Sequence, residues 1–265
     1  MTPKYPGLMR LGRIGVLPLA VSVVAVGQWL AGGRLGTLFQ ADAALVVLGG
    51  TLAALAVSFP ASTLRRAMSA VRVVFASQRT SSDLLVARFT DYAIRVRKRG
   101  VMSLESELSR VAADPFLARA LGLLVDGTEA DDLRQALQAA SHALEDADEE
   151  CVQVLETAGG YAPTLGILGA VLGLMHVMEN LTAPAKLGSG IAVAFVSTVY
   201  GVAAANLVLL PLAMRLRMSA RVRAVHREAT IEGAVALQRK TPPRILEAQL
   251  DGFIRAAEHS VNRAA

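Results

Sequence analysis

Four long stretches without Asp, Glu, Lys or Arg limit what this chain can fold into. Each has the length of about 20 residues that an α-helix needs to cross the hydrocarbon core of a bilayer. None of them alternates polar with apolar residues, as the strands of a membrane barrel do. The pattern predicts an all-α, polytopic membrane protein with four transmembrane helices, at 14–33, 43–64, 157–178 and 187–214.

The composition agrees with charged segments that separate membrane spans. The 265 residues are 53% hydrophobic and 18% charged, and their mean hydropathy is +0.45. Lys4, Arg10 and Arg13 precede the first stretch as in a signal peptide, but its length and the second stretch close behind it favour a retained span. The single cysteine, Cys151, precludes an intrachain disulfide and fits a reducing cytoplasm.

The distribution of arginine and lysine predicts the orientation. These residues gather before the first span, between the second and third spans and after the fourth, whereas the two other loops contain only Arg34 and Lys186. By the positive-inside rule, both termini and the central segment are expected on the cytoplasmic side of the membrane. Membrane orientation also accounts for the net charge of +5, and no aromatic-basic pattern points to nucleic acid as a partner.

This orientation divides the chain into four parts. We expect an N-terminal segment with a transmembrane hairpin over 1–64 and a helical cytoplasmic domain over 65–156. The third and fourth spans follow over 157–214, and a cytoplasmic tail that begins as a helix occupies 215–265.

Apolar spacing predicts that the central segment is helical. Leu85, Phe89 and Tyr92 share one face of a helix that ends at a basic cluster. Asp114, directly before a proline, is typical of a helix start. A further long helix is expected to run through the acidic patch at 145–150 into the third span.

The third and fourth spans are rich in small residues. Gly169 and Gly173 have the spacing at which membrane helices approach closely. Pro163 and Pro211 lie near the cytoplasmic ends of these spans, and a proline there removes a backbone hydrogen bond, so both are candidate hinges. The fourth span carries two stripes of small residues that predict a tight helical partner: Gly190, Ala194 and Thr198, and Ser197, Gly201 and Ala205.

The spans offer no titratable carboxylate or amine at membrane depth. Proteins that move ions across a bilayer usually keep an ionisable group there. His176 lies near one end of the third span, where a histidine more often packs or contacts the interface. If ions cross this protein, the carboxylate must therefore come from another chain. The polar groups within the spans are Thr164, Ser197, Thr198, Tyr200 and Asn206.

Signs of an enzyme are missing from the sequence. There is no nucleophile–base pair, no metal-ligand cluster and no glycine-rich phosphate loop beside a lysine. The four histidines are scattered without ligand spacing. We therefore expect neither catalysis nor a bound metal or cofactor.

Several motifs together resemble one known family along nearly the whole chain. The longest are PTLGILGAVLGLMHVMENL (163–181) and KLGSGIAVAFVSTVYGVAAANLVLLPLAMRL (186–216). Shorter ones are GGRLGTLFQ (32–40), RKRGVMSLESEL (97–108), and the words DPFL and LLVDGT at Asp114 and Leu123. In this order they are similar to the MotA/PomA family of flagellar stator A subunits.

The resemblance implies a location in the bacterial inner membrane and a homopentamer around a dimer of a MotB-type B subunit. Each B chain would supply one membrane helix with an aspartate. In that family, ion binding is thought to rotate the A ring and to push the rotor protein FliG through charge pairs. The motifs carry the rotor-contact role over to Arg97, Lys98 and Glu105. The same resemblance makes Pro163 and Pro211 the hinge prolines.

The identity of the transported ion can be inferred from the oxygen ligands that the spans offer. Sodium must exchange water for several oxygen atoms, so a sodium path needs hydroxyl and carbonyl groups near the aspartate. Sodium-type relatives have a threonine where this chain has Ala170, and a second one at Thr198, which is kept. The missing hydroxyl favours protons, with Ala170, Thr198 and Thr164 as the candidate ion-path residues.

Two other functions compete with a stator. The ExbB/TolQ proton channels are similar to this chain in their last two spans. They have a single span before the cytoplasmic region, however, whereas two are expected here. A purely structural scaffold would conduct nothing when produced with its partner.

Overall fold

The computed structural model describes residues 39–76, 82–182 and 184–263, and the single positions 22, 26, 30, 32 and 36. The expected first span, 14–33, lies almost entirely outside this part of the chain. Every regular element within the described residues is a helix, which confirms the all-α fold class.

Three consecutive helical segments near the start of the described chain join into one longer helix. The segments α2 (Ala41–Ala44), η2 (Leu45–Gly49) and α3 (Gly50–Ser58) form one continuous helix with a π-helical turn in its middle. The remaining elements are α4 (Ala61–Ala76), α5 (Ser82–Arg99), η3 (Val101–Leu104), α6 (Glu105–Leu108), α7 (Pro115–Val125), α8 (Ala130–Glu179), α9 (Pro184–Ala203), η4 (Ala204–Leu209), α10 (Leu210–Gln238) and α11 (Pro243–Arg263).

Three helices of the described chain are long and apolar enough to cross a membrane, namely Ala41–Ser58, Ala130–Glu179 and Leu187–Gln238. They contain the expected third and fourth spans and the first part of the expected second span, and α8 continues from the acidic patch into the third as predicted.

The second span was expected over 43–64, and this boundary was wrong. The helix ends at Ser58, where Phe59 takes an extended conformation with φ −131° and ψ 145°. The cause is Pro60, because the ring of a proline disfavours the helical conformation of the residue before it. The chain then begins a separate helix, α4, at Ala61.

The chain forms two compact units. Unit 1 consists of Met1–Ser77 and Glu150–Leu216, and unit 2 of Gln78–Glu149 and Arg217–Ala265. In unit 1, α3 and α4 pack on the parts of α8 and α10 that belong to it. The buried residues of this core are Leu55, Ala67, Cys151, Val152, Val154, Ala158, Ala213 and Leu216.

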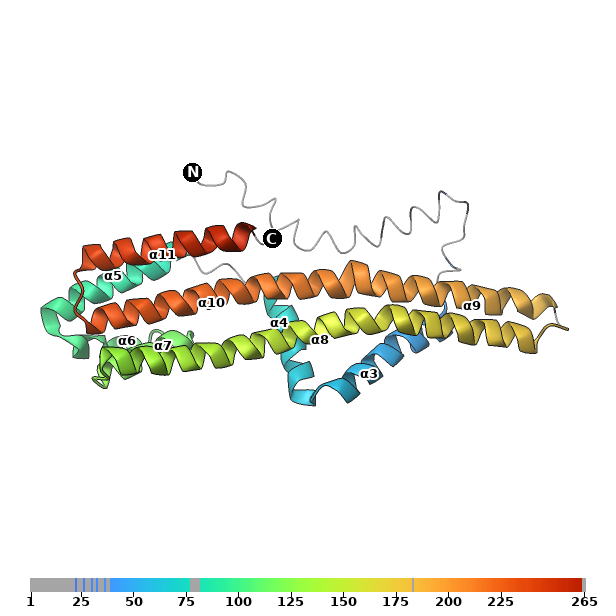
Figure 1. Cartoon of the computed structure of the whole chain (residues 1–265), viewed down its shortest axis with the longest axis horizontal. Coiled ribbons are helices and arrows are strands. Elements are labelled where there is room, and N and C mark those ends of the chain that lie inside the picture. Colours follow the sequence, from blue (N-terminus) through green and yellow to red (C-terminus); the bar gives the residue numbers. More distant parts are fainter. Residues whose placement is uncertain are drawn as a thin grey trace. The chain divides into compact units, whose positions relative to one another are not determined.

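Unit 2 has a larger core built from helices far apart in sequence. Figure 1 shows α5 and α11 side by side, and they are in extensive contact. The aromatic ring of Phe89 lies so close to Gly233 of α10 that a Cβ there would be 2.6 Å from it. Complete burial of a Leu or Phe side chain contributes about 1.5–3 kcal/mol. The largest fully buried side chains here are Tyr92, Phe89, Leu104, Leu117, Leu121, Leu124, Leu133, Leu137, Ile231, Leu237 and Leu246.

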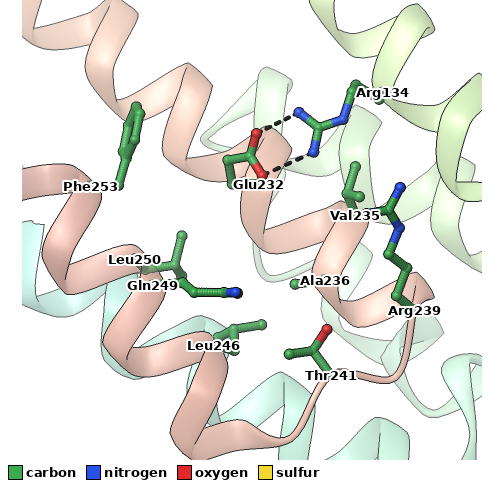
Figure 2. A pocket seen from close by; sticks show the side chains of 10 residues that line it. All are labelled: Arg134, Glu232, Val235, Ala236, Arg239, Thr241, Leu246, Gln249, Leu250 and Phe253. Carbon is green, nitrogen blue, oxygen red and sulfur yellow. Dashed lines mark hydrogen bonds and ion pairs between the residues drawn. The ribbon is translucent and has the colours of Figure 1, made fainter.

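Ion pairs connect α8 and α10 within unit 2. Arg134 donates to both carboxylate oxygens of Glu232, at 2.5 and 2.9 Å, and this pairing lowers the pKa of Glu232. Figure 2 shows the pair at the edge of a cavity of about 360 Å³ that Leu246, Leu250 and Phe253 of α11 also line. Partly exposed pairs contribute about 0–1 kcal/mol each, so they mainly fix the register of the two helices. Further pairs along the same helices are Arg217–Glu149, Arg223–Asp148, Arg227–Asp148 and Arg239–Asp131.

Candidate functional sites

The small residues of α8 and α9 bring the two helix backbones into direct contact. A Cβ at Gly201 would lie 2.5 Å from the carbonyl oxygen of Ala162, and one at Gly166 would lie 2.9 Å from that of Ser197. A Cβ at Gly173 would lie 2.8 Å from the amide nitrogen of Ala194. The tight partner predicted for the fourth span is therefore the third span of the same chain.

Two neighbouring hydroxyls occupy different positions at this contact. Ser197 is completely buried, and its Oγ donates to the carbonyl oxygen of Val193 at 2.8 Å. Thr198 is half-buried, and its Oγ1 lies 3.4 Å from the carbonyl oxygen of Ala194. Each hydroxyl thus directs its proton to its own helix and retains lone pairs as acceptors.

The helix Ala41–Ser58 covers one flank of the α8–α9 pair. A Cβ at Gly50 would lie 3.2 Å from the side chain of Leu165, and one at Gly169 would lie 3.4 Å from that of Val46. On the same side, the backbone amide of Gln40 donates to the hydroxyl of Tyr200 at 3.4 Å.

Ala170 and Thr198 lie on the opposite flank. Five residues of α-helix turn Ala170 about 140° away from Leu165, and one residue turns Thr198 about 100° away from Ser197, which faces Gly169. Large apolar side chains of this flank remain exposed in the single chain, among them Ile167 and Leu174 of α8 and Phe195 and Val202 of α9.

Thr164 lies apart from these two residues. Six residues separate it from Ala170, which corresponds to about 120° around α8. Its exposed hydroxyl donates to the carbonyl oxygen of Tyr161 at 2.8 Å. The hydroxyl of Tyr161 in turn lies 3.0 Å from that of Ser58. The structure therefore brings Ala170 and Thr198 to one flank but not Thr164.

The two prolines lie in different helical surroundings. Pro163 lies inside α8, which continues through it to Glu179. Pro211 follows closely on η4, where the backbone has π-helical hydrogen bonding between Ala204 and Leu209. Proline removes one hydrogen bond from each ladder. The π-helical segment was not predicted, and such segments are frequent at functional positions of helices.

The expected rotor-contact residues flank a short turn in unit 2. Arg97 and Lys98 are exposed in the last turn of α5, and Glu105 is exposed in the first turn of α6. Between these helices Gly100 has a φ of +78°, which glycine adopts without strain. None of the three charged side chains forms an ion pair with another described residue, so their charges remain available.

A buried carboxylate fastens this turn to α5. Glu107 is 6% exposed and accepts hydrogen bonds from Arg95 at 2.7 Å and from Arg110 at 2.8 Å. The bond from Arg95 lowers the pKa of Glu107. Arg95 also donates to Asp91 from its Nε at 2.8 Å, and its guanidinium lies 5.6 Å from the ring centre of Tyr92.

Sequence reasoning missed the role of Glu107. The signal was its spacing, because Glu107 lies three residues after the buried Leu104 and four before the buried Val111. That spacing places the carboxylate on the inner face of the turn.

Known proteins match the chain along almost its whole length. The sequence profile described as the MotA/TolQ/ExbB proton channel family matches residues 109–229. Motility protein A of Bacillus subtilis is 30% identical over 246 residues, which cover 92% of this chain and 90% of that protein. Chemotaxis protein PomA of Vibrio alginolyticus is 25% identical over 252 residues, which cover 95% and 96%.

Solved structures agree with these relatives. The structure of C. jejuni MotAB aligns with a TM-score of 0.85 and 27% identity, covering 92% of this chain and 95% of that one. The flagellar MotAB stator complex from Bacillus subtilis aligns with a TM-score of 0.80 and 28% identity, covering 92% and 93%.

Three observations agree with one another. The backbones of α8 and α9 are in close contact, an exposed apolar flank lies beside that contact, and known proteins match nearly the whole chain. The resemblance seen in the motifs is confirmed, because the relatives that match over most of their length include proteins named motility protein A and chemotaxis protein PomA. The chain belongs to the MotA/TolQ/ExbB proton channel family, among its flagellar stator A subunits.

Proposed function

We propose that this chain, together with a B subunit, conducts ions through the membrane and converts their flow into torque on the flagellar rotor. The observation that carries the proposal is the flank of α8 and α9 at Ala170 and Thr198. It combines small residues with exposed apolar side chains on helices of membrane length, and no carboxylate of the chain lies within the stretches 157–178 and 187–214. Such a flank fits a partner helix that supplies the ionisable group.

The topology we propose has four spans, with both termini and the central domain in the cytoplasm. Besides the three long apolar helices of the described residues, this topology includes the first stretch, 14–33, whose composition and length fit a membrane helix. The parts are those expected from the sequence: the hairpin in 1–64, the cytoplasmic domain in 65–156, the second pair of spans in 157–214 and the tail in 215–265. The asymmetry of Arg and Lys supports the orientation.

The proposed partner is a dimer of MotB-type B subunits within a homopentamer of this chain. The two similar solved structures are MotAB complexes, which supports the pairing with a B subunit. Phe195 is 72% exposed and Ile167 is 60% exposed in the single chain. Side chains of this size on the inner flank of a ring would pack against a central helix.

Protons are the proposed ion. The side chain of Ala170 has no oxygen to offer, so of the two candidate ion-path residues on the flank only Thr198 supplies a side-chain oxygen. A dehydrated sodium ion needs several oxygen ligands, whereas a proton needs only the carboxylate that binds it. Each proton that crosses about 150 mV releases about 3.5 kcal/mol from the electrical potential alone.

Rotor contact is assigned to Arg97, Lys98 and Glu105, and the proposed rotor partner is FliG. Exposed ion pairs contribute about 0–1 kcal/mol each, so single substitutions should be partly tolerated. Reversal of both basic charges, Arg97→Glu with Lys98→Glu, should slow swimming strongly. Arg119→Glu on α7, an exposed arginine outside the turn, is the control and should leave speed unchanged.

Swimming tests the proposed function directly. Cells whose only stator A subunit is this chain, produced with a proton-type B subunit, should swim at a speed that is independent of sodium. A protonophore should stop them. Speed that follows the sodium concentration would overturn the assignment of protons, and immotile cells with correctly inserted protein would contradict the stator function.

A further inference from the structure

Helix α4 lies in unit 1 near the cytoplasmic ends of the third and fourth uncharged stretches. It follows the second span after the turn at Phe59 and Pro60, and Figure 1 shows it crossing the α8 ribbon instead of running along it. Its inner face belongs to the core cluster that also contains Val152 and Ala158 of α8 and Leu216 of α10. These three residues lie within five positions of 157 and 214, where the uncharged stretches of the third and fourth spans reach their cytoplasmic ends.

The level of α4 therefore coincides with the edge of the apolar part of unit 1. A helix that crosses the spans at this level lies along the boundary between hydrocarbon and water. This placement rests on the membrane topology proposed above.

The two faces of α4 differ in chemistry. Thr63 and Ala67 are buried in the core of unit 1. Arg65, Met68 and Arg72, spaced three and four residues apart, are all exposed on the opposite face. The helix contains three arginines and no acidic residue.

The three arginines of α4 are not equivalent. Arg66 lies 3.7 Å from Glu150 and points toward α8. Arg65 and Arg72 form no ion pair with any other described residue. Two guanidinium groups on one exposed stripe thus have no counter-charge within the described part of the chain, and an exposed methionine lies between them.

We propose that α4 is an interfacial helix whose Arg65 and Arg72 bind the phosphate groups of anionic lipids in the cytoplasmic leaflet. A guanidinium group matches phosphate oxygens with two parallel hydrogen bonds. Met68, which is 58% exposed, reaches the acyl boundary between the two arginines. The lipids anchor the outer side of unit 1 at the depth where the spans end.

Lipid retention by the full chain in complex with its B subunit tests the proposal. The complex is extracted from membranes that contain phosphatidylglycerol, and native mass spectrometry counts the lipids that remain bound. The double variant Arg65→Gln with Arg72→Gln should weaken phosphatidylglycerol binding by roughly tenfold, since each arginine near an anionic surface contributes attraction. Arg66→Gln is the matched control on the same helix and should bind as the wild type does.

A further double variant separates the charge of the two arginines from their paired hydrogen bonds. Arg65→Lys with Arg72→Lys keeps the charges but loses the paired hydrogen bonds, so it should retain an intermediate amount of lipid. Equal retention by the wild type and the double glutamine variant would overturn the proposal. So would an equal loss in Arg66→Gln, because the effect would then be that of charge anywhere on α4.

Failure of the lipid site and failure of the stator function have different signatures. A complex that binds phosphatidylglycerol through Arg65 and Arg72 but never supports swimming would support the lipid site and contradict the stator function. Normal swimming with lipid retention that ignores both arginines contradicts only the lipid site. Loss of the oligomer in the double variant, with lipid retention per chain unchanged, would assign the stripe to a neighbouring copy and overturn the proposal.

Discussion

At the scale of single residues, Glu107 shows how the rotor-contact turn is held. Its carboxylate is buried and accepts hydrogen bonds from two arginines, one on α5 and one after α6. Arg95 also holds Asp91 on its own helix. The exposed charges at the turn thus stand on a network that fixes α6 against the end of α5.

Substitution of Glu107 by glutamine should therefore destabilise unit 2. The neutral side chain leaves Arg95 and Arg110 without their shared counter-charge, and loss of such charged hydrogen bonds costs about 2 kcal/mol. Thermal unfolding of the purified full chain should show a lower midpoint. Glu105→Gln is the control, because an exposed side chain without an ion pair among the described residues should change stability by less than about 0.5 kcal/mol. Equal effects of the two variants would contradict the network.

The same carboxylate should make stability depend on pH. Arg95 lowers the pKa of Glu107 from its usual 4.5, so the folded protein binds its proton less readily than the unfolded chain does. The stabilisation is complete above pH 4.5 and is lost as the pH falls through the lower pKa of the folded state. The difference in unfolding midpoint between wild type and Glu107→Gln should narrow as the pH falls below 4.5. A difference that stays constant down to about pH 3 would be inconsistent with this linkage.

At the scale of helices, the contact between α8 and α9 requires glycine at several positions. A Cβ at Gly201 would lie 2.5 Å from the carbonyl oxygen of Ala162, which is backbone and cannot turn aside. Gly188, at the other end of α9, has no heavy atom within 4 Å of such a Cβ. The two glycines therefore form a matched pair of sites for substitution.

Gly201→Ala should push α8 and α9 apart. Overpacking of a close contact costs about 1–3 kcal/mol, so the variant complex should unfold at a lower temperature and support slower swimming. Gly188→Ala should keep the wild-type unfolding midpoint and speed. If both substitutions were neutral, the backbone contact would not be needed for assembly.

Pro211 gives a second test for the helices. The π-helical turns of η4 end two residues before it, and the proline offers no amide proton to the carbonyl of Leu207. Pro211→Ala restores that donor and should stiffen the junction between η4 and α10. The expected outcome is normal accumulation in the membrane with slower swimming. Unchanged speed would remove the proposed hinge role of this proline.

At the scale of the whole molecule, local patterns predicted most of the helices. Asp114 begins α7 as expected, and its Oδ1 accepts a hydrogen bond from the amide of Leu117 at 3.2 Å. Leu85, Phe89 and Tyr92 are all buried in the core of unit 2. Capping residues and helical spacing act within a few positions, so the sequence displays them directly.

Features that depend on distant residues could not be predicted in this way. The pair of Arg134 and Glu232 joins positions 98 residues apart. The packing of α11 on α5 gives the tail a structural role that its arginine content did not reveal. The end of the second span was missed for a local reason, because hydropathy continues past Pro60 while the helix does not.

We propose that the carboxylate for ion transfer comes from a partner chain, since this chain has no Asp or Glu in its uncharged spans. Proton flux into cells or vesicles that contain this chain with a B subunit, driven by an imposed membrane potential, tests this directly. We expect flux with the intact B subunit and none when the membrane aspartate of that subunit is replaced by asparagine. Flux that persists with the asparagine variant, or that this chain supports alone, would contradict it.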